Sequence, residues 1–125
     1  MPTVSMTVRG SGELRRNLNR LRGNERRQAQ VDALDAGARI VETQAKIYTT
    51  PNVDTGTLRS SIMVDEVTPE RAIIAPHTDY AEYVEFGTSR MQAYPYMRPA
   101  LDQHESEIIG AVEATIAAFV DSVRA

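Results

Sequence analysis

The chain has 125 residues, a net charge of -3 and no cysteine. Its length predicts one domain over residues 1–125, and the missing cysteine excludes disulfides, thiolate catalysis and cysteine-based zinc sites. No apolar run approaches the ~20 residues of a membrane-spanning helix, and the first residues lack the pattern of a secretory signal. We therefore expect a folded protein that is compatible with a reducing cytosol.

The first part of the chain predicts a strand and two helices. Residues 3–8 alternate between apolar and polar side chains, which is typical of a half-buried strand. A short amphipathic helix is expected over residues 11–22, since three leucines recur there at helical spacing. The next helix, which Gly23-Asn24 can cap, is expected to run about 24 residues to Tyr48. It carries a wide apolar face rich in alanine, the clearest helical pattern in the chain. Gly37 interrupts that helix at about 1 kcal/mol relative to alanine, so we expect another element to pack closely on it.

The second part predicts a loop, a hairpin and two more helices. Residues 49–56 have turn composition, and strands over 58–67 and 71–75 make the hairpin. The aromatic block at 80–86 favours a short helix, although its alternation also fits a strand. A long closing helix is expected over 99–123. This order indicates the α+β class: a small antiparallel β-sheet with two long helices packed against it, plus short helices and a long connector loop.

The connector, residues 88–97, has no secondary-structure pattern. Loops of this length are often functional. Its Met91, Tyr94, Tyr96 and Met97 are residue types favoured at protein interfaces. Two interpretations remain open, and we expect some of these side chains to anchor the loop on the core and others to face a partner.

The triplet Asp54-Thr55-Gly56 is the signature of aspartic proteases, in which two aspartates share one proton. That fold is nearly all β and places its aspartate at the end of an apolar strand. Here the triplet follows a long predicted helix and a turn. We therefore interpret it as a turn or cap, and keep a protease as a remote alternative.

No other catalytic or metal-binding constellation stands out. Asp79, Glu82 and Glu85 could share a helix face and hold a hard cation, but no glycine-spaced calcium loop surrounds them. His77 and His104 are isolated in sequence, which favours surface or hydrogen-bonded histidines. The sequence therefore predicts no catalytic residue, no metal and no cofactor.

The N-terminal segment is strongly basic. Residues 1–30 hold seven arginines between Arg9 and Arg27 and two glutamates, a net charge of +5 that leaves -8 for the remainder. Such a segment can bind nucleic acid, meet the acidic face of a neighbouring copy, or form a solvated helix face. The absence of aromatic residues in it weakens the case for single-strand binding.

Three blocks in this order resemble the tail-completion, or head–tail joining, proteins of long-tailed bacteriophages (siphoviruses). The blocks are Pro51-Asn-Val-Asp-Thr-Gly-Thr-Leu-Arg-Ser-Ser-Ile62, Tyr80-Ala-Glu-Tyr-Val-Glu-Phe-Gly-Thr88 and Tyr94-Pro-Tyr-Met-Arg-Pro-Ala-Leu101. The resemblance covers residues 51–101. Tyr96 stands where the family more often has phenylalanine, and the basic segment has no counterpart that we can assign.

The resemblance implies a structural virion protein of the phage neck, not an enzyme. Family members are expected to form a ring, with six copies, that ends the tail tube and joins it to the head connector or stopper protein. The implied partners are further copies, the tail tube protein and the head connector, with no membrane. Genome DNA would pass through the lumen without specific binding. Assembly would take place in the host cytoplasm, and a minor tail or connector-adaptor protein is the alternative.

The contacts of such a ring are expected at the 54–56 turn, the aromatic block and the connector. The candidate interface residues are Asp54, Thr55, Gly56, Tyr80, Tyr83, Glu85, Phe86, Gly87, Thr88, Arg90, Met91, Tyr94, Tyr96 and Met97. We expect the arginines of residues 9–27 to face neighbours or the outer wall, because an arginine-lined lumen would hold DNA phosphates strongly.

Overall fold

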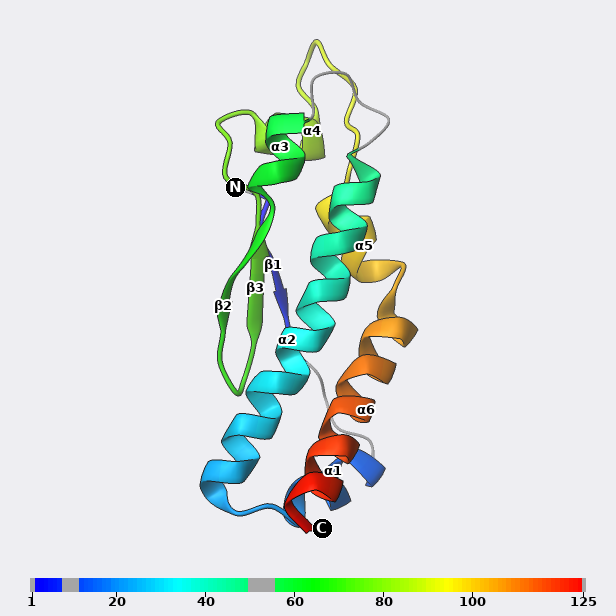
Figure 1. The fold of residues 1–125 in the computed structure, drawn as a ribbon. Helices are drawn as coiled ribbons and strands as arrows, with labels where there is room; N and C mark the ends of the chain where they lie inside the picture. Colours follow the sequence, from blue (N-terminus) through cyan, green and yellow to red (C-terminus); the bar gives the residue numbers. More distant parts are fainter. Residues whose placement is uncertain (1, 8–11, 50–55, 125) are drawn as a thin grey trace.

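The computed structural model describes residues 2–7, 12–49 and 56–124. Its elements are β1 (Val4–Met6), α1 (Gly12–Asn19), α2 (Gly23–Tyr48), α3 (Gly56–Ser61), β2 (Met63–Val67), β3 (Ala72–Ala75), α4 (Ala81–Phe86), α5 (Met97–Asp102) and α6 (Glu105–Arg124). The molecule is elongated, with the sheet along one side of α2 and α6 along the other (Figure 1). Helices α3 and α4 and the connector form one end, and α1 with the last turns of α6 forms the other. The predicted α+β class is confirmed.

The sheet has the strand order β1-β3-β2, and both pairings are antiparallel. Val4 of β1 and Val64 of β2 lie on either side of Ile74 in the central strand. The hairpin turn is closed by the backbone N–H of Thr68, which donates to the carbonyl of Arg71 at 2.8 Å. The predicted first strand is confirmed over Val4–Met6, and the predicted hairpin is confirmed over Met63–Val67 and Ala72–Ala75.

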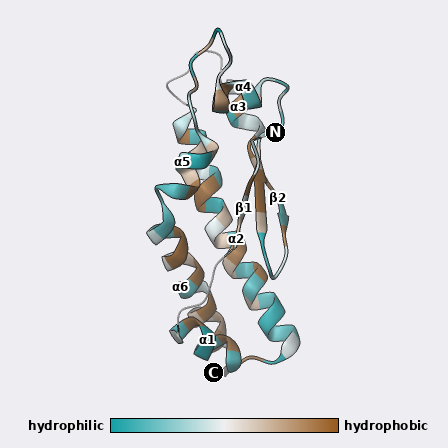
Figure 2. Cartoon of the chain, turned by 180° about the vertical axis from the view of Figure 1, so that it is seen from behind, coloured by the Kyte–Doolittle hydropathy of each residue, from teal (hydrophilic) through white to brown (hydrophobic). Residues whose placement is uncertain are grey.

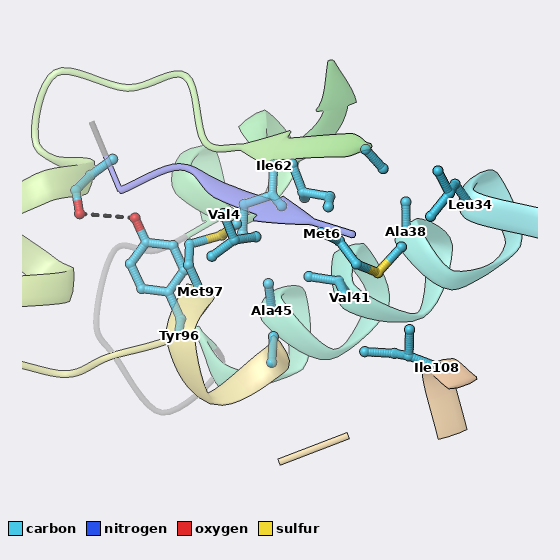
Figure 3. Packing of buried hydrophobic residues seen from close by; sticks show 14 of the residues in the cluster. Val4, Met6, Leu34, Ala38, Val41, Ala45, Ile62, Tyr96, Met97 and Ile108 are labelled. Atoms are coloured by element: carbon cyan, nitrogen blue, oxygen red, sulfur yellow. Dashed lines mark hydrogen bonds between the residues drawn. The ribbon is translucent and has the colours of Figure 1, made fainter. Parts of the chain in front are cut away.

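One hydrophobic core lies between the sheet, α2 and α5 (Figure 3). Met6 points from β1 toward Val41 on α2. Gly37 permits this approach, because a Cβ there would lie 2.9 Å from Met6 Cε and 3.1 Å from Ile108 Cγ2 of α6. The expectation that Gly37 marks a close contact is confirmed, and the contact involves both the sheet and α6.

A second hydrophobic core joins α1, the first half of α2 and α6. Leu14 and Leu18 are buried in it from α1, and Leu21 follows just after that helix. They meet a row of apolar residues on α6, namely Val112, Ile116 and Val120. Figure 2 shows that the outer side of the first turns of α2 is mainly hydrophilic. None of the helices that the structure describes has the length and apolarity to span a bilayer.

The long helix predicted to run about 24 residues to Tyr48 is confirmed as α2, which begins at Gly23. Glu25 helps to start it, because its Oε1 accepts the backbone N–H of Arg22 at 3.0 Å. The buried face is also narrower than predicted, since Ile47 is 53% exposed. Alanines rather than the larger residues occupy most of the buried positions.

The predicted strand over 58–67 is wrong in its first part, which is the helix α3. Leu58 and Ile62 are buried four residues apart, a helical spacing that the apolar run after them obscures. Serine hydroxyls support this turn: Ser60 Oγ donates to the carbonyl of Gly56 at 2.8 Å, and Ser61 Oγ to that of Leu58 at 2.7 Å.

The single closing helix predicted over 99–123 is also wrong, because α5 and α6 are separate helices. The break falls at Gln103 and His104, where no glycine or proline marks it. Tyr48 at the end of α2 occupies the break: its hydroxyl donates to Gln103 Oε1 at 3.0 Å and lies 3.1 Å from His104 Nε2. A tertiary contact thus accompanies a helix break that the local sequence does not predict.

Candidate interaction site

The connector begins at a glycine that no other residue could replace without strain. Gly87 follows α4 and has a φ of 76°, a conformation that side chains with a Cβ rarely adopt. A Cβ at this position would also lie 2.8 Å from the backbone nitrogen of Ala93 and 2.9 Å from the carbonyl oxygen of Met91. Gly87 therefore lets the chain turn and lets the returning part of the connector pass close beside it.

The tip of the connector is a hydrogen-bonded turn. The backbone N–H of Thr88 donates to the carbonyl of Met91 at 2.9 Å. The Thr88 hydroxyl accepts the N–H groups of Arg90 at 3.2 Å and Met91 at 3.0 Å. Further along, the N–H of Tyr94 donates to the carbonyl of Val84 in α4 at 2.8 Å. The connector thus has a defined conformation although it contains no helix or strand.

Glu85 fixes the far end of the connector. Its side chain is only 4% exposed, and its Oε1 accepts the backbone N–H groups of Tyr96 at 3.0 Å and Met97 at 2.8 Å. Its Oε2 accepts the N–H of Arg98 at 3.3 Å. These are the N–H groups at the start of α5, which lack partners within the helix. The carboxylate therefore caps α5 and is itself compensated for its burial.

Tyr96 is the second anchor. It is fully buried, and its hydroxyl donates to the carbonyl of Ala81 at 2.8 Å (Figure 3). Burial raises the pKa of Tyr96 well above its usual value, and the charges of Glu85 and then Tyr80 raise it further. This tyrosine therefore holds its proton, and the neutral hydroxyl ties the connector to the first turn of α4.

Several large apolar side chains at this end remain exposed. Phe86 is 66% exposed, Tyr83 53%, Tyr94 48%, Met91 39% and Tyr80 37%. We call these five residues the aromatic surface. Since Tyr96 and Met97 are buried, the connector residues divide between both of the open interpretations: two anchor the loop and two point into solvent.

The remaining candidate residues are spread over the same end of the molecule. Gly56 is the first residue of α3, and Arg90 and Thr88 are exposed on the connector. Asp54 and Thr55 lie outside the described residues. The interface role of every candidate residue stays a prediction.

The carboxylates considered for a cation do not converge. Glu85 is turned inward to α5, whereas Asp79 and Glu82 are exposed. Among the described residues no group of three metal-ligating side chains is close enough to hold a metal ion.

The histidines have partners that sequence spacing did not reveal. His77 Nε2 lies 2.8 Å from Asp65 Oδ1 across the hairpin, and its backbone N–H donates to Ser61 Oγ at 3.0 Å. The serine hydroxyl donates to the carbonyl of Leu58, not to the imidazole. Serine, histidine and aspartate are thus close together, but the hydroxyl is not aligned for the proton transfer that nucleophilic catalysis needs.

One family model matches the chain, over residues 12–87, from α1 to the glycine that opens the connector. Its description is "Bacteriophage HK97-gp10, putative tail-component". No curated protein and no solved structure matches the chain. The match covers the short helix α1, the long helix α2, α3, the hairpin and α4, and it ends where the connector begins.

Proposed function

We propose that this chain, which belongs to the HK97-gp10-like family of bacteriophage tail components, is a ring-forming subunit of the virion neck. The ring ends the tail tube at its head-proximal side and joins it to the head connector. A tail component is part of the virion and works by contact with other virion proteins. We propose that this protein makes those contacts and carries out no chemical reaction.

The observation that supports this proposal most strongly is the aromatic surface on a fixed frame. The exposed rings of Phe86 and Tyr83 leave apolar area in water, at a free-energy cost of ~25 cal/mol per Å². The backbone around them is already held by Gly87, the Thr88 turn and the Glu85 cap. A surface that is ordered before binding loses little conformational entropy when a partner covers it. This combination is typical of a preformed protein-binding site.

A ring explains how so small a protein joins two large structures. Copies that contact each other head to tail close into a ring when the rotation between them closes. We propose six copies, with the aromatic surface against a neighbouring copy or the tail tube protein. DNA passes through the lumen without specific binding, and the arginines near the N-terminus face neighbours or the outer wall.

A minor tail or connector-adaptor protein would use the same surface at another place in the tail. Position in the particle separates this alternative from a neck ring. The protease alternative has less support, because Gly56 begins a helix and the matched family is one of tail components. Asp54→Asn should leave particle assembly unchanged, and a proteolytic defect in that variant would revive the protease.

Electron microscopy of purified tails, with subunits counted at each end, tests the proposal. The expected result is a ring of this protein at the head-proximal end. Its absence there, or its presence at the distal tip, would overturn the neck assignment. Phe86→Ser should abolish incorporation, whereas Ile47→Ser, a matched control at an exposed apolar residue of α2, should incorporate normally.

A further inference from the structure

The end of the molecule opposite the aromatic surface carries a basic surface. We call it the basic end; it consists of six exposed arginines on α1, in the turn between α1 and α2 and at the start of α2, namely Arg15, Arg16, Arg20, Arg22, Arg26 and Arg27. The ion pairs that the described residues form involve none of them. Of the two glutamates nearby in sequence, Glu25 is engaged with the backbone of Arg22. The positive charge of this end therefore faces solvent unpaired.

The fold makes this end still more attractive to an anion. The positive end of the α2 dipole lies at Arg22, Arg26 and Arg27, where cations are unfavourable. Beside them a shallow groove of about 300 Å³ runs between α2 and the hairpin turn. Its lining is Asn24, Arg27, Gln28, Val31 and Pro69. Hydrogen-bond donors and a guanidinium thus line a depression that could receive a carboxylate side chain.

The chain carries a complementary surface on α6. Its outward residues recur at spacings of three and four and are all exposed: Glu107, Gly110, Ala114, Ala118 and Asp121. We call this set the α6 stripe. Between residues 105 and 123 the sequence has no lysine or arginine. A Cβ added at Gly110 would meet nothing within 4 Å. The α6 stripe is therefore negative at both ends and small in the middle, where long arginine side chains can approach the backbone.

The α6 stripe does not pair with the basic end of its own chain. Apolar residues of α2 and α6, among them Ala29, Ala33 and Ile116, pack between the two helices. Among the described residues no ion pair joins Arg26 or Arg27 to α6. These arginines therefore stay available for the α6 stripe of a neighbouring copy. This is the arrangement that a head-to-tail contact requires.

We infer that the basic end, through Arg26, Arg27 and the groove beside them, docks on the α6 stripe of a second copy of this chain. The inference builds on the ring of the proposed function and names one of its contacts. A second copy is favoured over DNA because the same chain supplies a negative, closely approachable helix face that would itself repel DNA. Charge complementarity also fixes which faces meet, since like surfaces repel.

A charge-exchange experiment tests the contact. One variant carries Arg26→Glu and Arg27→Glu, and the other carries Glu107→Arg and Asp121→Arg. Native mass spectrometry and sedimentation should show that the wild-type chain self-associates at low salt and dissociates as salt rises. Each variant alone should self-associate at least about tenfold more weakly. An equimolar mixture should recover the association, because each variant then offers the charge that the other lacks.

The mixture also guards against misfolding, since variants that do not fold cannot restore each other. Lys46→Glu with Arg59→Glu is the matched control: it makes the same change in charge away from the basic end and should associate like the wild type. A second measurement uses the absence of cysteine from the sequence. Mixing Arg27→Cys with Ala114→Cys under oxidation should give a disulfide-linked dimer, which neither should give as efficiently alone.

Several results would overturn the inference. These are a wild-type chain that stays monomeric at every salt concentration, variants that associate normally, and a mixture that stays apart. Duplex DNA that binds the basic end tightly, with salt-sensitive affinity lost in the arginine variant alone, would show a nucleic-acid site instead. A neck ring that is indifferent to these charges would end the inference and leave the proposed function intact. Charge-dependent self-association of a protein that does not lie at the neck would overturn the proposed function and leave the inference intact.

Discussion

The two ends of the molecule are stabilised in different ways and present different chemistry. At the connector end, a buried carboxylate, a buried tyrosine hydroxyl and a positive-φ glycine hold an irregular chain in place. At the basic end, leucines of α1 pack on α2 and α6 in an ordinary helical core. The first end exposes aromatic side chains and the second exposes arginines. A subunit with two unlike ends can make unlike contacts, which the proposed neck ring would require.

The largest effect on the connector end should come from Glu85→Ala. It leaves the N–H groups of Tyr96, Met97 and Arg98 without their acceptor and should lower the free energy of unfolding by about 3 kcal/mol. Urea unfolding measures this loss. Glu70→Ala, at an exposed residue of the hairpin turn, is the control and should change stability by less than about 0.5 kcal/mol. Equal losses in the two variants would contradict the capping role.

Gly87→Ala should be the next most damaging change. It forces an alanine into positive φ and places its Cβ against the backbone of Ala93, so we expect a loss of about 2 kcal/mol. Gly110→Ala gives the opposite sign, a gain of about 0.5–1 kcal/mol, because it adds a helix-favouring methyl group in open space. Thermal unfolding compares the two. A Gly87→Ala variant as stable as the wild type would show that the connector is not constrained as described.

Tyr96→Phe should have a smaller effect and a pH signature. At neutral pH the lost hydrogen bond to Ala81 should reduce stability by about 1 kcal/mol. Because folding raises the pKa of Tyr96, its contribution is fully present below the unfolded pKa near 10 and is lost as pH rises above that value. Unfolding measured from neutral to alkaline pH should show a steeper alkaline loss in the wild type than in the variant. Parallel curves would contradict the burial of the hydroxyl.

The smallest effect on stability should come from Phe86→Ser. The ring is 66% exposed, so unfolding should change by less than about 0.5 kcal/mol while assembly into tails is lost. Thermal unfolding and a particle-incorporation assay together separate the two readouts. A variant that unfolds early, or one that assembles normally, would remove Phe86 from the aromatic surface as a contact.

Local periodicity allowed the sequence to predict much of the fold. The face of α2, the alternation in β1 and the short helix α4 all follow from side-chain spacing. The role of Gly37 could also be predicted, because a glycine in a helix is unfavourable unless space demands it. Such features depend on neighbours in the chain, which the sequence displays directly.

The errors came from contacts between distant residues. Tyr48 of α2 hydrogen-bonds to Gln103 at the break between α5 and α6, so the sequence near Gln103 does not predict the break. The interface role predicted for Glu85 stays a prediction, but its role as the cap of a helix that begins about a dozen residues later was missed. No local pattern connects a glutamate in one helix with the N-terminus of another. The division of the connector into anchors and exposed residues has the same origin, since Tyr96 is anchored by its hydrogen bond to the distant carbonyl of Ala81.

The central claim is that this chain works through contacts of a preformed aromatic surface in an assembled tail. A cryo-electron microscopy map of intact particles, resolved to side chains, tests it most directly. The account predicts a ring at the head-proximal end of the tail in which Tyr83, Phe86 and Tyr94 are covered by a neighbouring copy or the tail tube, with Glu85 still capping α5. A map in which these side chains face solvent in the assembled particle would contradict it.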